Sequence, residues 1–117
     1  MIKLYAYQKC GTCVKAIQWL QSHQIAFEVY PIREVSPSES ELQLALSFYD
    51  GDVHPLFNKS GKDYREMGLK NRLGSLSHSD VISLLRSNGN LIKRPFVVDN
   101  GRAWVGFKAD CWEVLLN

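Results

Sequence analysis

A pair of cysteines, Cys10 and Cys13, lies where the hydrophobic pattern of the chain changes its period. Residues 2–7 alternate between apolar and other side chains, with the apolar ones on one face, which predicts a strand. From Thr12 the apolar residues recur at helical spacing, and we expect this helix to end near His23. The two cysteines therefore lie in a loop that joins a strand to a helix.

The first thirty residues predict a strand, a helix and a second strand, which is a βαβ unit. Strand character returns at residues 26–30, directly before Pro31. Because crossovers between parallel strands are right-handed, we expect this first helix and the last helix of the chain to lie on the same face of the sheet. The apolar stripe expected on the first helix consists of Val14, Ala16, Ile17, Trp19 and Leu20.

Residues 33–90 are predicted to be mostly helical, which is far longer than a usual connection between strands. Ser36 and Glu39 have the spacing of a capping box and predict the start of the first helix of this insert. A short helical stretch is expected at residues 64–69. Another helix is predicted to be capped by Ser77.

The C-terminal part predicts a hairpin followed by a helix. Residues 96–98 form a buried strand, residues 100–101 are Asn-Gly, a hairpin-turn signal, and residues 103–105 form the returning strand. A helix over residues 108–116 closes the chain. Without the insert, the order is βαβ followed by ββα. This is the element order of a thioredoxin-like α/β fold with a mixed four-stranded sheet.

Length and composition agree with one ordinary globular domain. The chain has 117 residues, of which 45% are hydrophobic and 22% charged. We predict a single thioredoxin-like domain over residues 1–117, with its core at about 1–32 and 91–117 and the insert at about 33–90. The net charge of +2 argues against a protein that binds nucleic acid through bulk charge.

The N-terminal residues lack the pattern of a signal peptide, and no apolar run approaches the roughly 20 residues of a membrane span. We therefore expect a cytoplasmic protein without membrane association. In that compartment thiols are kept reduced, so a structural disulfide is not expected.

Cys10 is placed to react as a thiolate. It lies just before the helix, where unpaired amides and the positive end of the helix dipole favour an anion, and Lys9 and Lys15 add positive charge nearby. Cys13 follows within the first helical turn on the same side. This arrangement predicts that Cys10 attacks a disulfide and that Cys13 resolves the mixed disulfide. A cycle that uses Cys10 and glutathione alone is also chemically sufficient.

The alternatives are two incidental cysteines or half of a zinc site. Zinc needs two further ligands, but His23, His54 and His78 show no paired spacing, so we predict no metal. Cys111 falls in the last helix and is expected to be a small core residue. No glycine-rich phosphate loop is present.

Arg94 and Pro95 directly precede the third predicted strand. A proline is tolerated at the first position of a strand for lack of an amide donor, which by itself implies no function. In a thioredoxin-like site, however, this proline is cis and leaves a backbone edge for a substrate chain. Arg94 would then lower the pKa of Cys10 or hold a glutathione carboxylate. The predicted catalytic residues are Cys10, Cys13 and Arg94, and the predicted substrate-binding residues are Lys9, Gly11, Thr12 and Pro95.

Four segments together resemble the arsenate reductase and Spx family of thioredoxin-like proteins. They are residues 10–13, 57–69, 91–98 and 105–107. The resemblance covers nearly the whole chain and implies a thioredoxin-like core with a helical insert. It implies no tightly bound cofactor.

Within this family the sequence is most similar to short relatives thought to be glutathione-dependent thiol reductases. That resemblance implies glutathione, or a thioredoxin- or glutaredoxin-type protein, as the electron donor. The arsenate reductases that use glutaredoxin resemble this chain in Cys10 and in one anion-binding arginine, Arg94. Their two further arginines have no counterpart in residues 54–58 or 105–107, which argues against arsenate as the substrate.

The Spx regulators are the alternative within the family. They bind the α subunit of RNA polymerase and use a CxxC pair as an oxidation switch. Cys10 and Cys13 resemble that switch, and residues 50–52, Asp-Gly-Asp, resemble part of the surface that faces the polymerase.

Overall fold

A computed structural model of the chain describes residues 1–116. Its centre is a four-stranded mixed sheet in the order β2-β1-β3-β4. β1 pairs parallel with β2 and antiparallel with β3, and β3 pairs antiparallel with β4. This is the α/β architecture predicted from the sequence. The strands are β1 (Ile2–Ala6), β2 (Phe27–Pro31), β3 (Phe96–Asp99) and β4 (Arg102–Val105).

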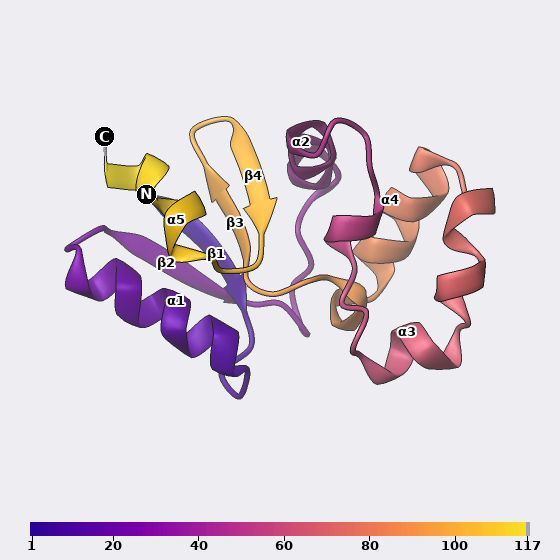
Figure 1. The fold of residues 1–117 in the computed structure, drawn as a ribbon, viewed down its shortest axis with the longest axis horizontal. Coiled ribbons are helices and arrows are strands. Elements are labelled where there is room, and N and C mark those ends of the chain that lie inside the picture. The colour runs from indigo at the N-terminus through magenta and orange to yellow at the C-terminus, as the bar shows by residue number, and fades with distance from the viewer. Residues whose placement is uncertain (117) are drawn as a thin grey trace.

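Helices cover both faces of the sheet and form most of the segment between β2 and β3 (Figure 1). α1 and α5 lie on one side of the sheet, α2 runs beside β4, and α3 and α4 lie farther from the strands. The α-helices are α1 (Gly11–Ser22), α2 (Glu39–Phe48), α3 (Lys62–Glu66), α4 (His78–Ser87) and α5 (Ala109–Trp112). Short 3₁₀ turns are η1 (His54–Leu56), η2 (Leu69–Asn71), η3 (Leu73–Ser75), η4 (Gly89–Leu91) and η5 (Glu113–Leu116).

Alternation along the strands divides the core into two clusters. Ile2, Leu4 and Ala6 of β1 point toward α1 and α5 and pack in one cluster with Trp112. Tyr5 points to the opposite face and packs in the cluster that contains the buried residues of α2 and α4. The predicted apolar face of β1 is confirmed, as is the placement of the first and last helices on one side of the sheet.

The buried face of α1 differs from the predicted stripe. Cys13, Ala16 and Leu20 are completely buried, whereas Val14, which was predicted to be in the stripe, is 41% exposed. The helix turns Cys13 rather than Val14 toward the sheet, because these three positions align along the line of contact with the first core cluster.

The cap of α2 also differs from the prediction. Ser38, not Ser36, is the N-cap, and it forms a capping box with Glu41. The carboxylate of Glu41 accepts hydrogen bonds from Lys3 Nζ at 2.8 Å and from the Tyr5 hydroxyl at 2.7 Å. Both donors belong to β1. The helix therefore begins where its capping acid can also bind the sheet, which a local reading of the sequence does not reveal.

The predicted cap of α4 and the predicted hairpin turn are confirmed, whereas two predicted helices differ in extent: the stretch predicted at residues 64–69 is α3, which ends at Glu66, followed by η2. The Ser77 side chain caps α4 by accepting from the Asp80 amide at 3.1 Å. Asn100 and Gly101 form the hairpin turn with positive φ angles of 47° and 77°. The predicted C-terminal helix is one α-helical turn followed by η5.

At Gly89 the backbone at the end of the helical insert lies against the chain that follows β2. A Cβ atom at this position would lie 1.9 Å from the carbonyl oxygen of Ile32, the residue after β2. Only glycine permits this approach of two backbones.

Candidate active site

The cysteine loop lies at the carboxyl end of β1, where α1 begins. Cys10 is the N-cap residue of α1 and is in an extended conformation, with φ −89° and ψ 118°. Its amide donates to the Tyr7 carbonyl and its carbonyl accepts from the Val14 amide, both at 3.0 Å. These two bonds fix the backbone of Cys10 between the strand and the helix. Its sulfur lies at the N-terminal end of α1, close to the Thr12 and Cys13 amides.

The environment of Cys10 favours its thiolate. Partial burial raises the pKa of Cys10, but the amides of Cys13 and Thr12, the Cys13 thiol and the charge of Arg94 together bring that pKa below its ordinary value of 9.0. The thiol is free and half-buried.

Cys13 has the opposite character. It is completely buried in the core cluster beneath α1. Burial, together with the hydrogen bond and charge of Cys10, raises the pKa of Cys13 to about 11. The loop therefore holds one thiol that ionises more readily than an ordinary cysteine and one that stays protonated at neutral pH.

Arg94 and Pro95 lie beside this loop. The Arg94–Pro95 peptide bond is cis, as predicted. Pro95 accepts a hydrogen bond from the Gly106 amide at 2.9 Å. Within residues 1–116, no hydrogen bond is formed by the backbone N–H or carbonyl of Arg94. The backbone N–H and carbonyl of Arg94 therefore have no partner among the described residues, and their role as a binding edge for a substrate chain stays a prediction.

A second arginine, which the sequence did not single out, reaches the same place. The Cζ atom of Arg33 lies 4.7 Å from the centroid of the Tyr7 ring, and the Cζ atom of Arg94 lies 5.3 Å from it. Arg33 follows β2 and Tyr7 follows β1. Because parallel neighbouring strands end at the same edge of a sheet, the βαβ prediction was the signal that could have found Arg33.

The other predicted residues are at the surface or elsewhere. Lys9, Gly11 and Thr12 are exposed in the cysteine loop and first turn of α1. Cys111 was predicted to be a core residue, and this prediction is wrong because its side chain is exposed. In the single turn of α5 the buried position is taken by Trp112, so its neighbour Cys111 points outward.

Within the described part of the chain, no three histidine, cysteine or acidic side chains are grouped as metal ligands. None of the helices in residues 1–116 has the length and apolar character needed to cross a membrane.

Sequence comparison finds relatives along almost the whole chain. The ArsC family matches residues 5–115. The uncharacterized protein YusI of Bacillus subtilis is 41% identical over 112 residues, which cover 96% of this chain and 95% of YusI. The global transcriptional regulator Spx of Streptococcus mutans is 29% identical over 110 residues, which cover 94% of this chain and 79% of Spx.

Solved structures similar to this chain include proteins described as ArsC family related or as an arsenate reductase. A putative ArsC family related protein from Bacteroides fragilis superimposes with a TM-score of 0.90 at 35% identity, covering 97% of this chain and 96% of that protein. A possible arsenate reductase from Streptococcus mutans gives a TM-score of 0.87 at 34% identity, covering 93% and 92%.

Proposed function

Because the chain belongs to the ArsC family, we propose that it is a thiol–disulfide oxidoreductase with Cys10 as the attacking thiol and glutathione as the reductant. The observation that carries this proposal is the opposite shift of the two thiol pKa values, downward for Cys10 and upward for Cys13. Disulfide exchange begins with a thiolate, so the asymmetry assigns the attack to Cys10.

In the proposed first step, the Cys10 thiolate attacks one sulfur of a substrate disulfide. A bond forms between Cys10 and that sulfur, the substrate S–S bond breaks, and the leaving thiolate takes up a proton. Cys10 loses its negative charge in this step. Since that charge helps to raise the pKa of Cys13, Cys13 then ionises more easily.

The second step releases the bound half of the substrate. The Cys13 thiolate attacks Cys10, a Cys10–Cys13 disulfide forms, and the second thiol leaves with a proton. Two molecules of glutathione then reduce this disulfide and are themselves oxidised to glutathione disulfide. Alternatively, glutathione attacks the mixed disulfide on Cys10 directly, and Cys13 takes no part.

Two arginines support glutathione as the reductant and as one half of a mixed-disulfide substrate. Arg33 and Arg94 both lie against Tyr7, close to the cysteine loop. Glutathione carries two carboxylates, which guanidinium groups bind through charge-assisted hydrogen bonds. Its peptide backbone can pair with the free N–H and carbonyl of Arg94. A thioredoxin- or glutaredoxin-type protein is the alternative donor at this edge.

Arsenate is not the substrate that we propose. Residues 54–58 and 105–107, where the arsenate reductases are expected to place two further arginines, contain none here. A tetrahedral oxyanion would therefore lose most of its charged partners.

Chemistry that depends on reduced thiols and glutathione fits a cytoplasmic location.

The proposal is tested by steady-state reduction of the mixed disulfide between glutathione and 2-mercaptoethanol, with glutathione as the reductant. We expect turnover in the wild type, none in Cys10→Ser, and full turnover in the matched control Cys111→Ser. Turnover that persists in Cys10→Ser contradicts the assignment of the nucleophile. A Cys13→Ser variant that keeps full turnover shows that glutathione alone resolves the mixed disulfide.

A redox-switched regulator that binds the α subunit of RNA polymerase is the second candidate. It is favoured by the similarity to Spx over 94% of the chain. The turn at residues 50–52 after α2 is partly exposed, with Gly51 at φ 85°. The absence of turnover, combined with a Cys10–Cys13 disulfide under mild oxidant and binding to the α subunit in only one redox state, would favour this candidate.

A further inference from the structure

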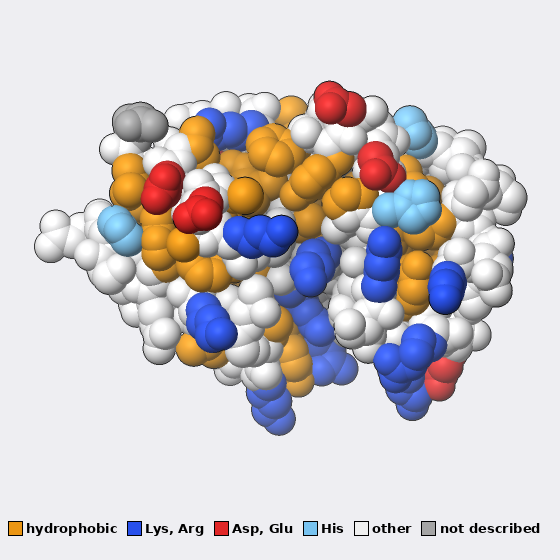
Figure 2. All heavy atoms as spheres, viewed as in Figure 1, with side chains coloured by type: hydrophobic (Ala, Val, Ile, Leu, Met, Phe, Trp, Pro, Cys, Tyr) orange, Lys and Arg blue, Asp and Glu red, His pale blue; other side chains and the backbone are white. Residues whose placement is uncertain are grey.

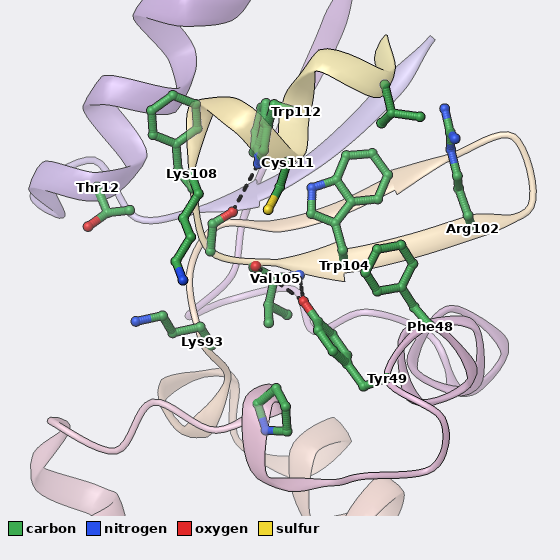
Figure 3. Close-up of a pocket in the computed structure, with 14 residues that line it drawn as sticks. Thr12, Phe48, Tyr49, Lys93, Arg102, Trp104, Val105, Lys108, Cys111 and Trp112 are labelled. Carbon is green, nitrogen blue, oxygen red and sulfur yellow. Dashed lines mark hydrogen bonds between the residues drawn. The ribbon is translucent and has the colours of Figure 1, made fainter.

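A cleft of about 640 Å³ lies between α2, β4 and α5 (Figure 3). It extends from Thr12, beside the cysteine loop, to Arg102 on β4. Its volume is within the range of small-molecule sites in proteins. Among the described residues that line it, neither Cys10 nor Cys13 is present. The cleft therefore adjoins the proposed active site, with which it shares Thr12 and parts of the segments 54–58 and 105–107, but it contains neither cysteine.

The walls of the cleft are largely aromatic and aliphatic. Phe48 is 53% exposed and its ring centroid lies 6.1 Å from that of Trp104, and Val114, which also lines the cleft, is 40% exposed. Figure 2 shows hydrophobic side chains gathered in this region, over β4 and between α5 and α2. Apolar side chains exposed in a concave site favour a ligand with an apolar body.

The end of the cleft near Thr12 is positively charged. Lys93 and Lys108 both line this end, and Figure 3 shows their side-chain nitrogens on the same side of the cleft. Within residues 1–116 neither lysine has a carboxylate within 4 Å, and no acidic residue lines the cleft. Arg102, by contrast, already pairs with Asp99 at 3.1 Å. The two lysines are therefore the charged groups available to bind an anion at this end of the cleft. At the far end, the buried Nε atom of Arg102 has no hydrogen-bond partner within residues 1–116.

The floor of the cleft holds a donor that the described residues leave unpaired. Trp104 is only 4% exposed, and its Nε1 atom has no hydrogen-bond partner in residues 1–116. Figure 3 shows this edge of the indole ring facing Cys111. The neighbouring Trp112, by contrast, donates to the Gly106 carbonyl at 3.2 Å. A buried donor without a hydrogen-bond partner reduces stability. Once the Cys111 side chain rotates, a bound ligand, or a water bound together with the ligand, can accept the hydrogen bond from Trp104 Nε1.

We propose that this cleft binds a small amphipathic carboxylate. Its aromatic or branched apolar body packs between Phe48, Trp104 and Val114, and its carboxylate binds Lys93 and Lys108. The charge of the cleft and its apolar walls select this class over neutral apolar molecules and over fully polar anions. The proposal requires no thiol chemistry and stands or falls separately from the proposed oxidoreductase activity.

The proposal is tested with two probes of equal shape, 1-naphthaleneacetate and its neutral amide 1-naphthaleneacetamide. Their affinities for the wild type are measured by calorimetry, and the indole N–H signals of the tryptophans are followed by NMR, with Trp104→Phe used to assign the Trp104 signal. We expect the acid to bind at least tenfold more tightly than the amide. The Trp104 signal should move on binding, while that of Trp19, which does not line the cleft, should not.

Charge variants test the role of the lysines. We expect Lys93→Gln combined with Lys108→Gln to weaken binding of the acid about tenfold and to leave binding of the amide unchanged. The matched control, Lys59→Gln combined with Lys70→Gln, removes two exposed lysines outside the cleft and should change neither affinity. Equal binding of acid and amide, an unmoved Trp104 signal at millimolar probe, or full acid affinity in the first variant would each overturn the proposal.

Discussion

Iodoacetamide should alkylate Cys10 much faster than Cys13 at pH 7, because alkylation requires the thiolate. The pKa of Cys13 is about 11, so about one molecule in ten thousand carries the Cys13 thiolate at this pH. The pKa of Cys10 lies below 9.0, which places its ionised fraction above about one in a hundred. The two thiolate populations therefore differ by at least about 100-fold.

Intrinsic nucleophilicity opposes part of this difference. A thiolate with a higher pKa reacts faster, and over a gap of about two units the gain is at most about tenfold. When ionisation and nucleophilicity are combined, Cys10 is therefore expected to be alkylated at least about tenfold faster than Cys13. Complete burial of Cys13 restricts access of the reagent and widens the ratio further.

The assay is timed alkylation across pH 5–10, followed by digestion and mass spectrometry of the peptides that contain each cysteine. Arg94→Gln should raise the pKa of Cys10 and slow its alkylation at pH 6 more than at pH 10, since the charge of Arg94 lowers that pKa. Arg65→Gln, which changes an exposed residue of α3, is the control and should have no effect. Equal rates for the two cysteines, or a midpoint for Cys10 at or above pH 9, would refute the reasoning.

Three further predictions concern stability and are measured by urea unfolding. Glu41→Ala should reduce the free energy of unfolding by about 2–3 kcal/mol, because it removes the acidic half of the capping box and leaves the Tyr5 hydroxyl without its acceptor. Glu39→Gln, in the same helix but in an exposed ion pair, should change the free energy of unfolding by less than about 1 kcal/mol. Burial raises the pKa of Glu41, but its hydrogen bonds bring the net pKa below 4.5, so the stability that its charge provides is complete above pH 4.5 and is lost as the pH falls through the lower folded-state value. The difference between wild type and Glu41→Gln should therefore shrink at pH values below that window, and a constant difference would contradict the role of the ionised carboxylate. Gly89→Ala should destabilise the fold by about 3 kcal/mol or more, because its Cβ would meet the Ile32 carbonyl at 1.9 Å, whereas Gly74→Ala, with open space around it, should be nearly neutral.

Local signals in the sequence were sufficient for most of the secondary structure. The alternation in β1, the Ser77 cap and the Asn100–Gly101 turn are each specified by residues adjacent in the chain, so their physical causes can be read without the fold. The cysteine loop at the start of a helix is equally local. The sequence therefore predicted the element order, the thioredoxin-like α/β class and the position of the CxxC pair.

Tertiary packing decided what depends on partners distant in the chain. The choice of Ser38 over Ser36 as the cap follows from the bonds of Glu41 to β1. The position of Arg33 against the Tyr7 ring follows from the parallel pairing of β1 and β2.

The same distinction applies to the thiols. Spacing identified Cys10 and Cys13 as a pair. The difference between their pKa values, however, depends on the burial of Cys13 and on the charge of Arg94, which lies more than eighty positions away in the sequence. Cys111 shows the converse, since a one-turn helix exposes a residue whose local sequence suggested the core. Periodicity and capping are properties of neighbouring residues, whereas desolvation and long-range charge arise only when the folded chain brings distant groups together.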